Sequence, residues 1–148
     1  MASLQSISVI IAARNEAENL PRLLGSLAAL DYPRDLFEIV LVSDHSTDNS
    51  LEIIAQYKAT LPMKIIDFQD SLQGLTGKKA ALQKGIETAT NDLLVFTDAD
   101  CEVPTGWLKA ISRNFTDKTD YLLSYSLIKR TDGGSSFRLK NFERSIYY

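Results

Sequence analysis

Residues 92–100 read Asp-Leu-Leu-Val-Phe-Thr-Asp-Ala-Asp, a short apolar run that stops at two aspartates. A run of this length, with branched and aromatic side chains, is typical of a strand buried on both faces of a parallel sheet. Comparable runs occupy residues 6–12, 37–43 and 63–67. Amphipathic stretches separate the four runs, as crossover helices do between parallel strands. The sequence therefore predicts an α/β fold, a three-layer sandwich with a mainly parallel sheet between layers of helices.

Four helices are expected between and after these strands. We expect Asn15 to cap the first helix, with Glu18 three residues further on. The second helix is expected over residues 49–57, the third from Lys78, and the fourth after Pro104. Their inward faces follow from helical spacing: Leu20, Leu23, Leu24 and Leu27 in the first, Leu82, Ile86 and Ala89 in the third, and Trp107 or Leu108, Ile111 and Phe115 in the fourth.

The last part of the chain predicts one more strand and one more helix. The expected elements are a fifth strand at 121–127, a turn or linker at 131–136 and an amphipathic helix at 137–148. No repeat or low-complexity tract interrupts the chain. We therefore expect one domain over 1–148, with a core at 1–128 and a basic linker and helix at 129–148. Because nothing ends the last helix before Tyr148, we expect this domain to be incomplete at its C-terminus.

Composition and charge exclude several classes of protein. The 148 residues are 45% apolar and 24% charged, which suits one globular domain and excludes a disordered or collagen-like chain. Residues 1–128 carry 11 Lys and Arg against 17 Asp and Glu, a net charge of −6, and residues 129–148 carry a net charge of +3. Because the net negative charge of residues 1–128 repels the phosphate backbone, nucleic acid is not an expected partner. No apolar stretch is long enough to cross a bilayer.

The single cysteine and the single histidine exclude other kinds of chemistry. Cys101 can form neither an internal disulfide nor a multi-thiolate zinc site, which fits a reducing cytoplasm. It lies between two acidic residues, so a nucleophilic role is not expected. His45 alone cannot supply a Ser-His-Asp triad or a His-rich zinc site. We therefore interpret His45 as a loop residue beside the site, without a role of its own.

Polar clusters follow each predicted strand at its carboxyl end. They are residues 14–16, 44–48, 67–70 and 98–102. The carboxyl ends of parallel strands meet at one edge of a sheet, so these clusters are expected to converge. Asp44, Asp98 and Asp100 would repel one another there, and a divalent cation would remove that conflict. By chance alone, a chain with this composition is expected to contain about one Asp-x-Asp. The alternative to a metal site is that Asp98 and Asp100 form a solvated turn or cap the helix after Pro104.

Gly77-Lys78-Lys79 is similar to half of a nucleotide phosphate loop but does not complete it. The Walker pattern requires a glycine at position 72 and Ser or Thr at position 79, where this chain has Leu72 and Lys79. Lys78 could still bind a phosphate at the N-terminus of the third helix, where main-chain N–H groups also favour anions. A solvated lysine on the first helical turn is the alternative.

Taken in order, four segments resemble the N-terminal part of the family 2 glycosyltransferases, which have the Rossmann-like GT-A fold of nucleotide-diphospho-sugar transferases. The segments are residues 8–16, 42–50, 77–86 and 95–100. They look like the family's opening strand with its Asn-Glu turn, its second aspartate motif, its Gly-Lys helix start and its metal-binding Asp-x-Asp. The chain departs from the family pattern at Ser43, His45 and Gln83, and these departures bear on the nucleotide preference.

The resemblance implies which residues bind the donor and the metal. Asp44 is expected to recognise the base or the ribose, Lys78 to approach the phosphates, and Asp98 with Asp100 to hold Mg²⁺ or Mn²⁺. The implied nucleotide-binding residues are Ala12, Ala13, Arg14, Asn15, Glu16, Asp44, Ser46, Lys78, Asp98 and Ala99. The general base of the family lies in the second half of the domain, so no catalytic residue is assigned in this chain.

The implied activity is that of an inverting glycosyltransferase. It would move a sugar from a nucleotide diphosphate sugar, a UDP-sugar by family habit, to a hydroxyl of a glycan, a lipid or another acceptor. A domain that binds the nucleotide sugar without turnover is the alternative, because the general base is not seen. A receiver-like domain phosphorylated on Asp44 or Asp98 fits the order of the elements less well. The expected location is the cytoplasm, or the cytoplasmic face of the membrane in a longer protein.

Overall fold

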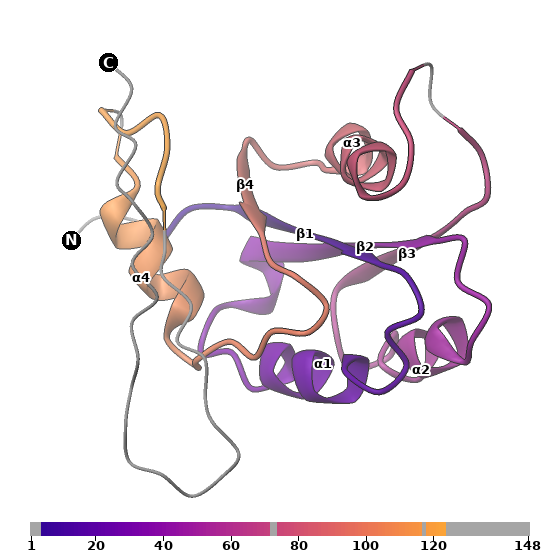
Figure 1. The fold of residues 1–148 in the computed structure, drawn as a ribbon. Coiled ribbons are helices and arrows are strands. Elements are labelled where there is room, and N and C mark those ends of the chain that lie inside the picture. Colours follow the sequence, from indigo (N-terminus) through magenta and orange to yellow (C-terminus); the bar gives the residue numbers. More distant parts are fainter. Residues whose placement is uncertain (1–3, 72–73, 117, 124–148) are drawn as a thin grey trace, which may run out of the picture.

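The computed structural model describes residues 4–71, 74–116 and 118–123. In this part of the chain, strands and helices alternate (Figure 1). The elements are β1 Ile7–Ala13, α1 Leu20–Ala28, the 3-10 helix η1 Arg34–Leu36, β2 Phe37–Asp44, α2 Ser50–Gln56, β3 Met63–Phe68, α3 Lys78–Thr88, β4 Leu93–Phe96 and α4 Trp107–Asn114. The turn and helix predicted over 131–148 lie outside the described residues. Among the described helices, none is long and apolar enough to cross a membrane.

The strands form one parallel sheet in the order β3-β2-β1-β4. Central β1 pairs with β2 along its whole length, from Ile7 opposite Phe37 to Ala13 opposite Ser43. β4 pairs only with the first part of β1, and its last residue, Phe96, lies opposite Ile10. The predicted α/β fold with a parallel sheet is confirmed.

Helices cover both faces of the sheet, as a three-layer sandwich requires (Figure 1). Successive residues of a strand point to opposite faces, so a strand covered on both sides is apolar throughout. On one face, Leu24 of α1 and Ile54 of α2 belong to the larger core cluster, together with Ile11. On the other face, Ala81 of α3 belongs to a smaller cluster with Val42. The leucines predicted to face inward in α1 are all buried: Leu20, Leu23, Leu24 and Leu27.

α3 packs on the sheet through small residues, and the inward face predicted for it was wrong. Its buried residues are Ala80, Ala81 and Gly85. Leu82 and Ala89 are half-buried, and Ile86 is exposed. The reason is close approach, because a Cβ added to Gly85 would lie 2.6 Å from Cγ2 of Ile10. Large side chains on this face would hold the helix away from the sheet, so they point elsewhere.

α1 begins at Leu20, with Asn19 at the N-cap position, so the predicted cap at Asn15 was wrong. The main-chain oxygen of Glu16 accepts hydrogen bonds from the N–H groups of Asn19 and Leu20 and closes the turn before the helix. Asn15 adopts a left-handed conformation with φ 54°, which asparagine tolerates better than most residues. Its side chain is thereby directed to the loop after β2 instead of the helix.

The end of the described chain departs from expectation in one element. α4 is packed as predicted, with Leu108 and Ile111 buried and Trp107 and Phe115 partly buried against the larger core cluster. The fifth strand predicted over 121–127 is not formed in its described part, 121–123, which is largely exposed. A strand needs a neighbouring strand to pair its main-chain N–H and C=O groups, and the described residues offer this segment none. Residues 124–127 lie outside the described part.

A polar cluster ties the segment before β4 to the start of the sheet. Oε1 of Glu38 accepts hydrogen bonds from the hydroxyl of Ser8 at 2.7 Å and from the main-chain N–H of Thr90 at 2.6 Å, and Oε2 lies 2.8 Å from Nζ of Lys64. Burial alone would raise the pKa of Glu38, but the hydrogen bonds from Lys64, Ser8 and Thr90 lower it from 4.5 to about 2. The charged carboxylate thus anchors the connection from α3 to β4.

Candidate functional site

The order of the strands indicates where a ligand should bind. The chain adds β2 and β3 on one side of β1 and then crosses over to add β4 on the other side. In parallel α/β sheets, ligands bind outside the carboxyl ends of the strands at such a switch point. Here β4 ends at Phe96 while β1 continues beyond that level to Ala13. The segments that follow these two strands, residues 14–17 and 97–102, are therefore the first candidates for a site.

Hydrogen bonds join the loop after β1 to the loop after β2. The main-chain N–H of Asn15 donates to Oγ of Ser46 at 3.1 Å, and Oδ1 of Asn15 accepts from the main-chain N–H of Thr47 at 2.8 Å. Oγ of Ser50 accepts from the main-chain N–H of Glu16 at 3.0 Å. Three predicted nucleotide-binding residues, Asn15, Glu16 and Ser46, are thus brought together by these contacts. The two loops form one connected unit beside the switch point.

Asp48 links the same two loops through its carboxylate. Its Oδ2 accepts a hydrogen bond from the main-chain N–H of Ala17 at 3.0 Å, and its Oδ1 accepts from the main-chain N–H of Ser50 at 3.0 Å and from the Ser50 hydroxyl. The bond from the Ser50 side chain is the main cause that lowers the pKa of Asp48 below its usual range. Asp48 belongs to the polar cluster 44–48 but is not among the nucleotide-binding residues predicted from the sequence. The one available signal was a carboxylate two residues before a helix, a usual place for main-chain hydrogen bonding.

Asp44 ends β2, and its carboxylate is buried beside His45. Asp44 is 3% exposed, and its Oδ1 lies 2.6 Å from Nδ1 of His45. His45 has a left-handed φ of 52°, and its Nε2 lies 3.1 Å from the main-chain oxygen of Gln69. His45 thus lies beside the candidate site, as expected, and it contacts Asp44, the residue predicted to recognise the base or ribose. That contact depends on the unusual backbone conformation, which the sequence did not reveal.

The turn after β4, residues 98–102, is called the acidic turn below and contains the predicted metal ligands. Asp98 forms an ion pair with Lys78 at the start of α3. The main-chain oxygen of Asp100 accepts a hydrogen bond from Nη2 of Arg22 on α1 at 2.7 Å. Because α1 and α3 lie on opposite faces of the sheet, the acidic turn is held from both sides (Figure 1). Arg22 gave no signal in the sequence, since its partner lies 78 positions away.

The start of α3 has the features of an anion site. Gly77 precedes the helix with φ 59° and ψ −142°, a conformation that is accessible to glycine and to few other residues. No side chain caps the first main-chain N–H groups of this described helix. These N–H groups carry partial positive charge, and Lys78 adds a full charge beside them.

Three of the predicted nucleotide-binding residues offer little more than their main-chain atoms. Ala13 and Ala99 are 2% and 3% exposed and belong to the larger core cluster. Ala12 is half-buried and packs against the smaller cluster. Arg14, in contrast, is exposed. Side-chain recognition at this edge therefore falls to the polar residues of the predicted set.

The described residues contain no complete metal centre, since no group of three or more His, Cys, Asp or Glu side chains is placed to hold an ion. Asp98 and Asp100 are both exposed and offer carboxylate oxygens, the donors that Mg²⁺ and Mn²⁺ prefer. Asp44 is engaged with His45, and Asp67 is at the end of β3, beyond β2 from the acidic turn. Two protein carboxylates fit an ion that takes its other ligands from phosphates and water, as Mg²⁺ usually does.

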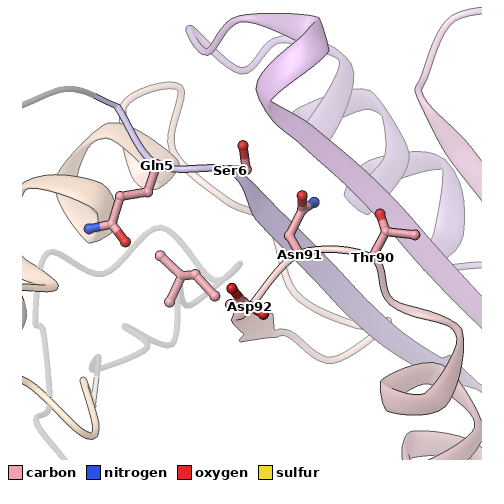
Figure 2. Close-up of a pocket in the computed structure, with 6 residues that line it drawn as sticks. Gln5, Ser6, Thr90, Asn91 and Asp92 are labelled. Atoms are coloured by element: carbon pink, nitrogen blue, oxygen red, sulfur yellow. The ribbon is translucent and has the colours of Figure 1, made fainter.

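A hollow of about 340 Å³ lies at the opposite edge of the sheet (Figure 2). It is lined by Gln5, Ser6, Thr90, Asn91, Asp92 and Leu93. These residues lie at the amino ends of β1 and β4, whereas ligands of parallel α/β sheets bind at the carboxyl ends. Two of its main-chain N–H groups are already used, because Thr90 donates to Glu38 and Asn91 donates to Ser8. The hollow is therefore separate from the candidate site.

The sequence matches known glycosyltransferases. A family model described as Glycosyl transferase family 2 matches residues 8–148. Glycosyltransferase AglE of Haloferax volcanii is 33% identical over 108 residues, which are 73% of this chain and 34% of AglE. Poly-beta-1,6-N-acetyl-D-glucosamine synthase of Staphylococcus epidermidis is 34% identical over 96 residues, which are 65% of this chain and 22% of the synthase. The match thus spans about a third or less of the length of these curated relatives.

Solved structures agree with the sequence match. A crystal structure of S. aureus TarS 1–349 in complex with UDP-GlcNAc has a TM-score of 0.66 and 30% identity, over 74% of this chain and 30% of that one. The mannosyltransferase PcManGT from Pyrobaculum calidifontis, in complex with GDP-Man and Mn²⁺, has a TM-score of 0.67 and 28% identity, over 74% of this chain and 32% of that one. The expected GT-A fold is confirmed by this likeness.

The four motifs, the parallel sheet and the comparisons lead to the same conclusion. The resemblance stated from residues 8–16, 42–50, 77–86 and 95–100 is confirmed over a longer part of the chain. The relatives and the neighbouring structures are enzymes that handle sugars, and two of the structures hold a nucleotide sugar. The chain belongs to glycosyl transferase family 2.

Proposed function

We propose that this chain is the donor-binding part of an inverting glycosyltransferase that uses a uridine diphosphate sugar. The observation that carries the proposal is the ion pair of Lys78 with Asp98, which joins the start of α3 to the acidic turn beside the switch point. Family membership and the nucleotide-sugar complexes of TarS and PcManGT support it. Because the match spans only part of the relatives, the activity of the whole protein belongs to the proposal.

The proposed pocket for the nucleoside lies between the loops after β1 and β2. We assign recognition of the base or the ribose to the buried carboxylate of Asp44. Arg14 and the segment Asn15–Glu16 would line this pocket, with Ala12 and Ala13 contributing main-chain atoms. The hydrogen bonds that Asn15 donates to Ser46 and accepts from Thr47 support this role, because they hold the two loops in one arrangement. A preorganised pocket loses less conformational freedom when the nucleotide binds.

In this proposal, Lys78 changes its partner when the donor binds. It is paired with Asp98 in the structure, at the uncapped start of α3. A diphosphate carries more negative charge than one carboxylate, so it attracts the Lys78 ammonium more strongly. Transfer of Lys78 to the phosphates would free the carboxylate of Asp98. The main-chain N–H groups at the start of α3 would add further hydrogen bonds to the same phosphates.

Asp98 and Asp100 would hold Mg²⁺ or Mn²⁺ against the diphosphate. Such an ion, when bound, neutralises the negative charge that develops on the leaving diphosphate. Arg22 fixes the main chain of Asp100, and the ion pair with Lys78 balances the charge of Asp98 beforehand. Since the described residues bring no third carboxylate to this point, we expect metal binding to depend on the nucleotide.

The proposed reaction is a single in-line displacement. The acceptor oxygen attacks the anomeric carbon opposite the diphosphate, so that its bond to this carbon forms as the carbon–oxygen bond to the diphosphate breaks. The configuration inverts, and the acceptor proton passes to a carboxylate base that we place outside the described residues. The relatives include a sugar polymer synthase and a beta-monoglucosyldiacylglycerol synthase, so we propose a glycan or lipid hydroxyl as acceptor. The single cysteine fits a cytoplasmic reaction, or one at the cytoplasmic face of a membrane.

Calorimetric titration of the chain with UDP, in the presence and absence of Mn²⁺, tests the proposal. We expect Mn²⁺ to increase the affinity for UDP by about tenfold or more, a factor that corresponds to about 1.4 kcal/mol. Asp100→Ala should remove this gain and leave the weaker, metal-free binding in place. Asp92→Ala is the matched control, because Asp92 lines the separate hollow (Figure 2) and directly precedes the amino end of β4.

The following results would contradict the proposal. One is that neither UDP nor GDP binds, with or without Mn²⁺, to a chain whose circular dichroism and thermal unfolding show it to be folded. The other is that Asp100→Ala and Asp92→Ala bind UDP and Mn²⁺ as the unaltered chain does. Loss of binding in both variants would also count against it, since the acidic turn would then have no special role.

A further inference from the structure

Asp44 is held by one specific protein donor. Its Oδ1 lies 2.6 Å from Nδ1 of His45, and the ring of His45 is fixed on its other side. Nε2 lies 3.1 Å from the main-chain oxygen of Gln69, and the ring meets Phe68 edge-on, with 6.0 Å between ring centroids. With the N–H on Nδ1, the hydrogen bond to Asp44 and the edge-on contact with Phe68 orient the imidazole. The carboxylate of Asp44 is therefore held in one orientation as well.

The two oxygens of Asp44 are not equivalent in this arrangement. A carboxylate only accepts hydrogen bonds, so Nδ1 of His45 is the donor and Oδ1 the acceptor. Within the described part of the chain, Oδ2 has no hydrogen-bond partner. The side chain of Asp44 is 5% exposed, so a ligand has little room to approach both oxygens. One oxygen is thus left for recognition, and the other is used by the protein.

We propose that His45 is a specificity-determining residue that makes Asp44 select uracil over guanine. The inference rests on the proposed function, in which Asp44 recognises the base. Uracil offers a carboxylate one N–H donor, at N3, which one free oxygen can accept. Guanine offers two adjacent donors, at N1 and at the exocyclic amine, which match a carboxylate with both oxygens free, in the bidentate manner of a guanidinium. With Oδ1 bound to His45, one guanine donor would have to share that oxygen with the Nδ1–H of His45, which weakens its hydrogen bond.

The bound nucleotide differs between solved structures that share this fold. TarS is seen with UDP-GlcNAc and PcManGT with GDP-Man, at similar identity to this chain. The overall fold therefore does not determine the base. A residue that changes the number of free oxygens on one buried carboxylate can do so, because an unpaired polar group is the strongest basis for rejecting a ligand.

The test compares UDP with GDP in two variants of one position. His45→Gly removes the donor and keeps the backbone conformation, because glycine adopts a φ of 52° without strain. His45→Asn is the matched control: asparagine also tolerates this conformation, and its side-chain amide can still donate to Asp44. Dissociation constants are measured by calorimetry with Mn²⁺ present, and thermal unfolding checks that each variant is folded.

We expect the unaltered chain to bind UDP at least about tenfold more tightly than GDP, a ratio that corresponds to about 1.4 kcal/mol. His45→Gly should reduce this ratio to about threefold or less, through tighter GDP binding or weaker UDP binding, whereas His45→Asn should retain most of it. A merely structural role for His45 would change both affinities together and leave the ratio as it was.

The outcomes separate this inference from the proposed function. If the folded chain binds no nucleoside diphosphate, the proposed function fails and the inference fails with it. If UDP binds but the ratio of UDP to GDP affinity is the same in His45→Gly as in the unaltered chain, only the inference is overturned. It is also overturned if the unaltered chain prefers GDP, or if His45→Asn loses the preference as completely as His45→Gly.

Discussion

Nη2 of Arg22, on α1, donates a hydrogen bond to the main-chain oxygen of Asp100 at 2.7 Å, which links the first helix to the middle of the acidic turn. The same guanidinium nitrogen lies 3.3 Å from Oδ1 of Asn19, at the start of α1. Arg22 is exposed, so its contribution is to orient the turn and not to fill the core. A hydrogen bond to the main chain fixes the peptide on which the Asp100 carboxylate is carried.

Arg22→Ala should lower the affinity for UDP in the presence of Mn²⁺ by about three- to tenfold, the effect of one hydrogen bond of about 1 kcal/mol. The affinity without Mn²⁺ should change little, because the turn then contributes less to binding. Arg113→Ala, which removes an exposed arginine from α4, is the matched control. Equal metal-dependent affinities in the two variants would exclude a positioning role for Arg22.

Asp48→Asn should loosen the connection between the loops after β1 and β2. The carboxylate accepts hydrogen bonds from Ala17 and Ser50, and an amide presents only one acceptor oxygen in its place. We expect a lower melting temperature and a weaker affinity for UDP both with and without Mn²⁺, because the proposed pocket for the nucleoside is affected and not the acidic turn. Calorimetry and thermal unfolding of this variant check the expectation. Asp35→Asn, which changes an exposed aspartate of η1, is the control. If only the metal-dependent part of the affinity changed, the assignment would be wrong.

Gly85→Ala should destabilise the fold although alanine favours helices. The added Cβ would lie 2.6 Å from Cγ2 of Ile10, so α3 or β1 must shift, and overpacking of this kind costs about 1 to 3 kcal/mol. The control is Gly25→Ala in α1, where the new Cβ would meet nothing within 4 Å beyond its chain neighbours and the helix's own backbone. That change should stabilise the chain by about 0.5 to 1 kcal/mol through helix propensity alone. The urea concentration at the midpoint of unfolding should therefore fall for Gly85→Ala and rise for Gly25→Ala.

Glu38→Gln should reduce the free energy of unfolding at pH 7 by an amount on the order of 2 to 3 kcal/mol. Despite burial, the hydrogen bonds from Lys64, Ser8 and Thr90 lower the pKa of this carboxyl to about 2. A lowered pKa means that the contribution is complete above the ordinary value of 4.5 and is lost as the pH falls from 4.5 toward 2.

Urea unfolding of both chains at pH 7, 4 and 2.5 measures this loss. The difference between the unaltered chain and Glu38→Gln should be largest at pH 7 and should shrink at each lower pH. Glu52→Gln, on the exposed side of α2, serves as the comparison and should give a small difference throughout. A difference for Glu38→Gln that stays constant with pH would show that its charge is not what stabilises the cluster.

Much of the fold followed from the sequence because parallel strands buried on both faces have an unmistakable pattern. The apolar runs at 6–12, 37–43, 63–67 and 92–97 all contain strands, and the leucines of α1 are all buried. The segment at 121–123 did not form the predicted strand. Its apolar residues favour a strand, but they do not show whether a neighbouring strand is available to pair with it. The inward face of α3 was wrong for a related reason, because the spacing between helix and sheet is a property of the packed structure.

The sequence by itself determined the family, the parallel layout and the set of polar segments that follow the strands, since each of these depends on residue types in order along the chain. Only the tertiary structure decided which of these residues touch. Lys78 with Asp98, Arg22 with Asp100 and Asp48 with Ala17 all join positions that are far apart in the chain. The left-handed backbone conformation of His45 also could not be predicted from the sequence. Local patterns report burial and helix or strand preference, whereas a hydrogen bond needs two groups at a fixed distance and angle, which only the packed fold provides.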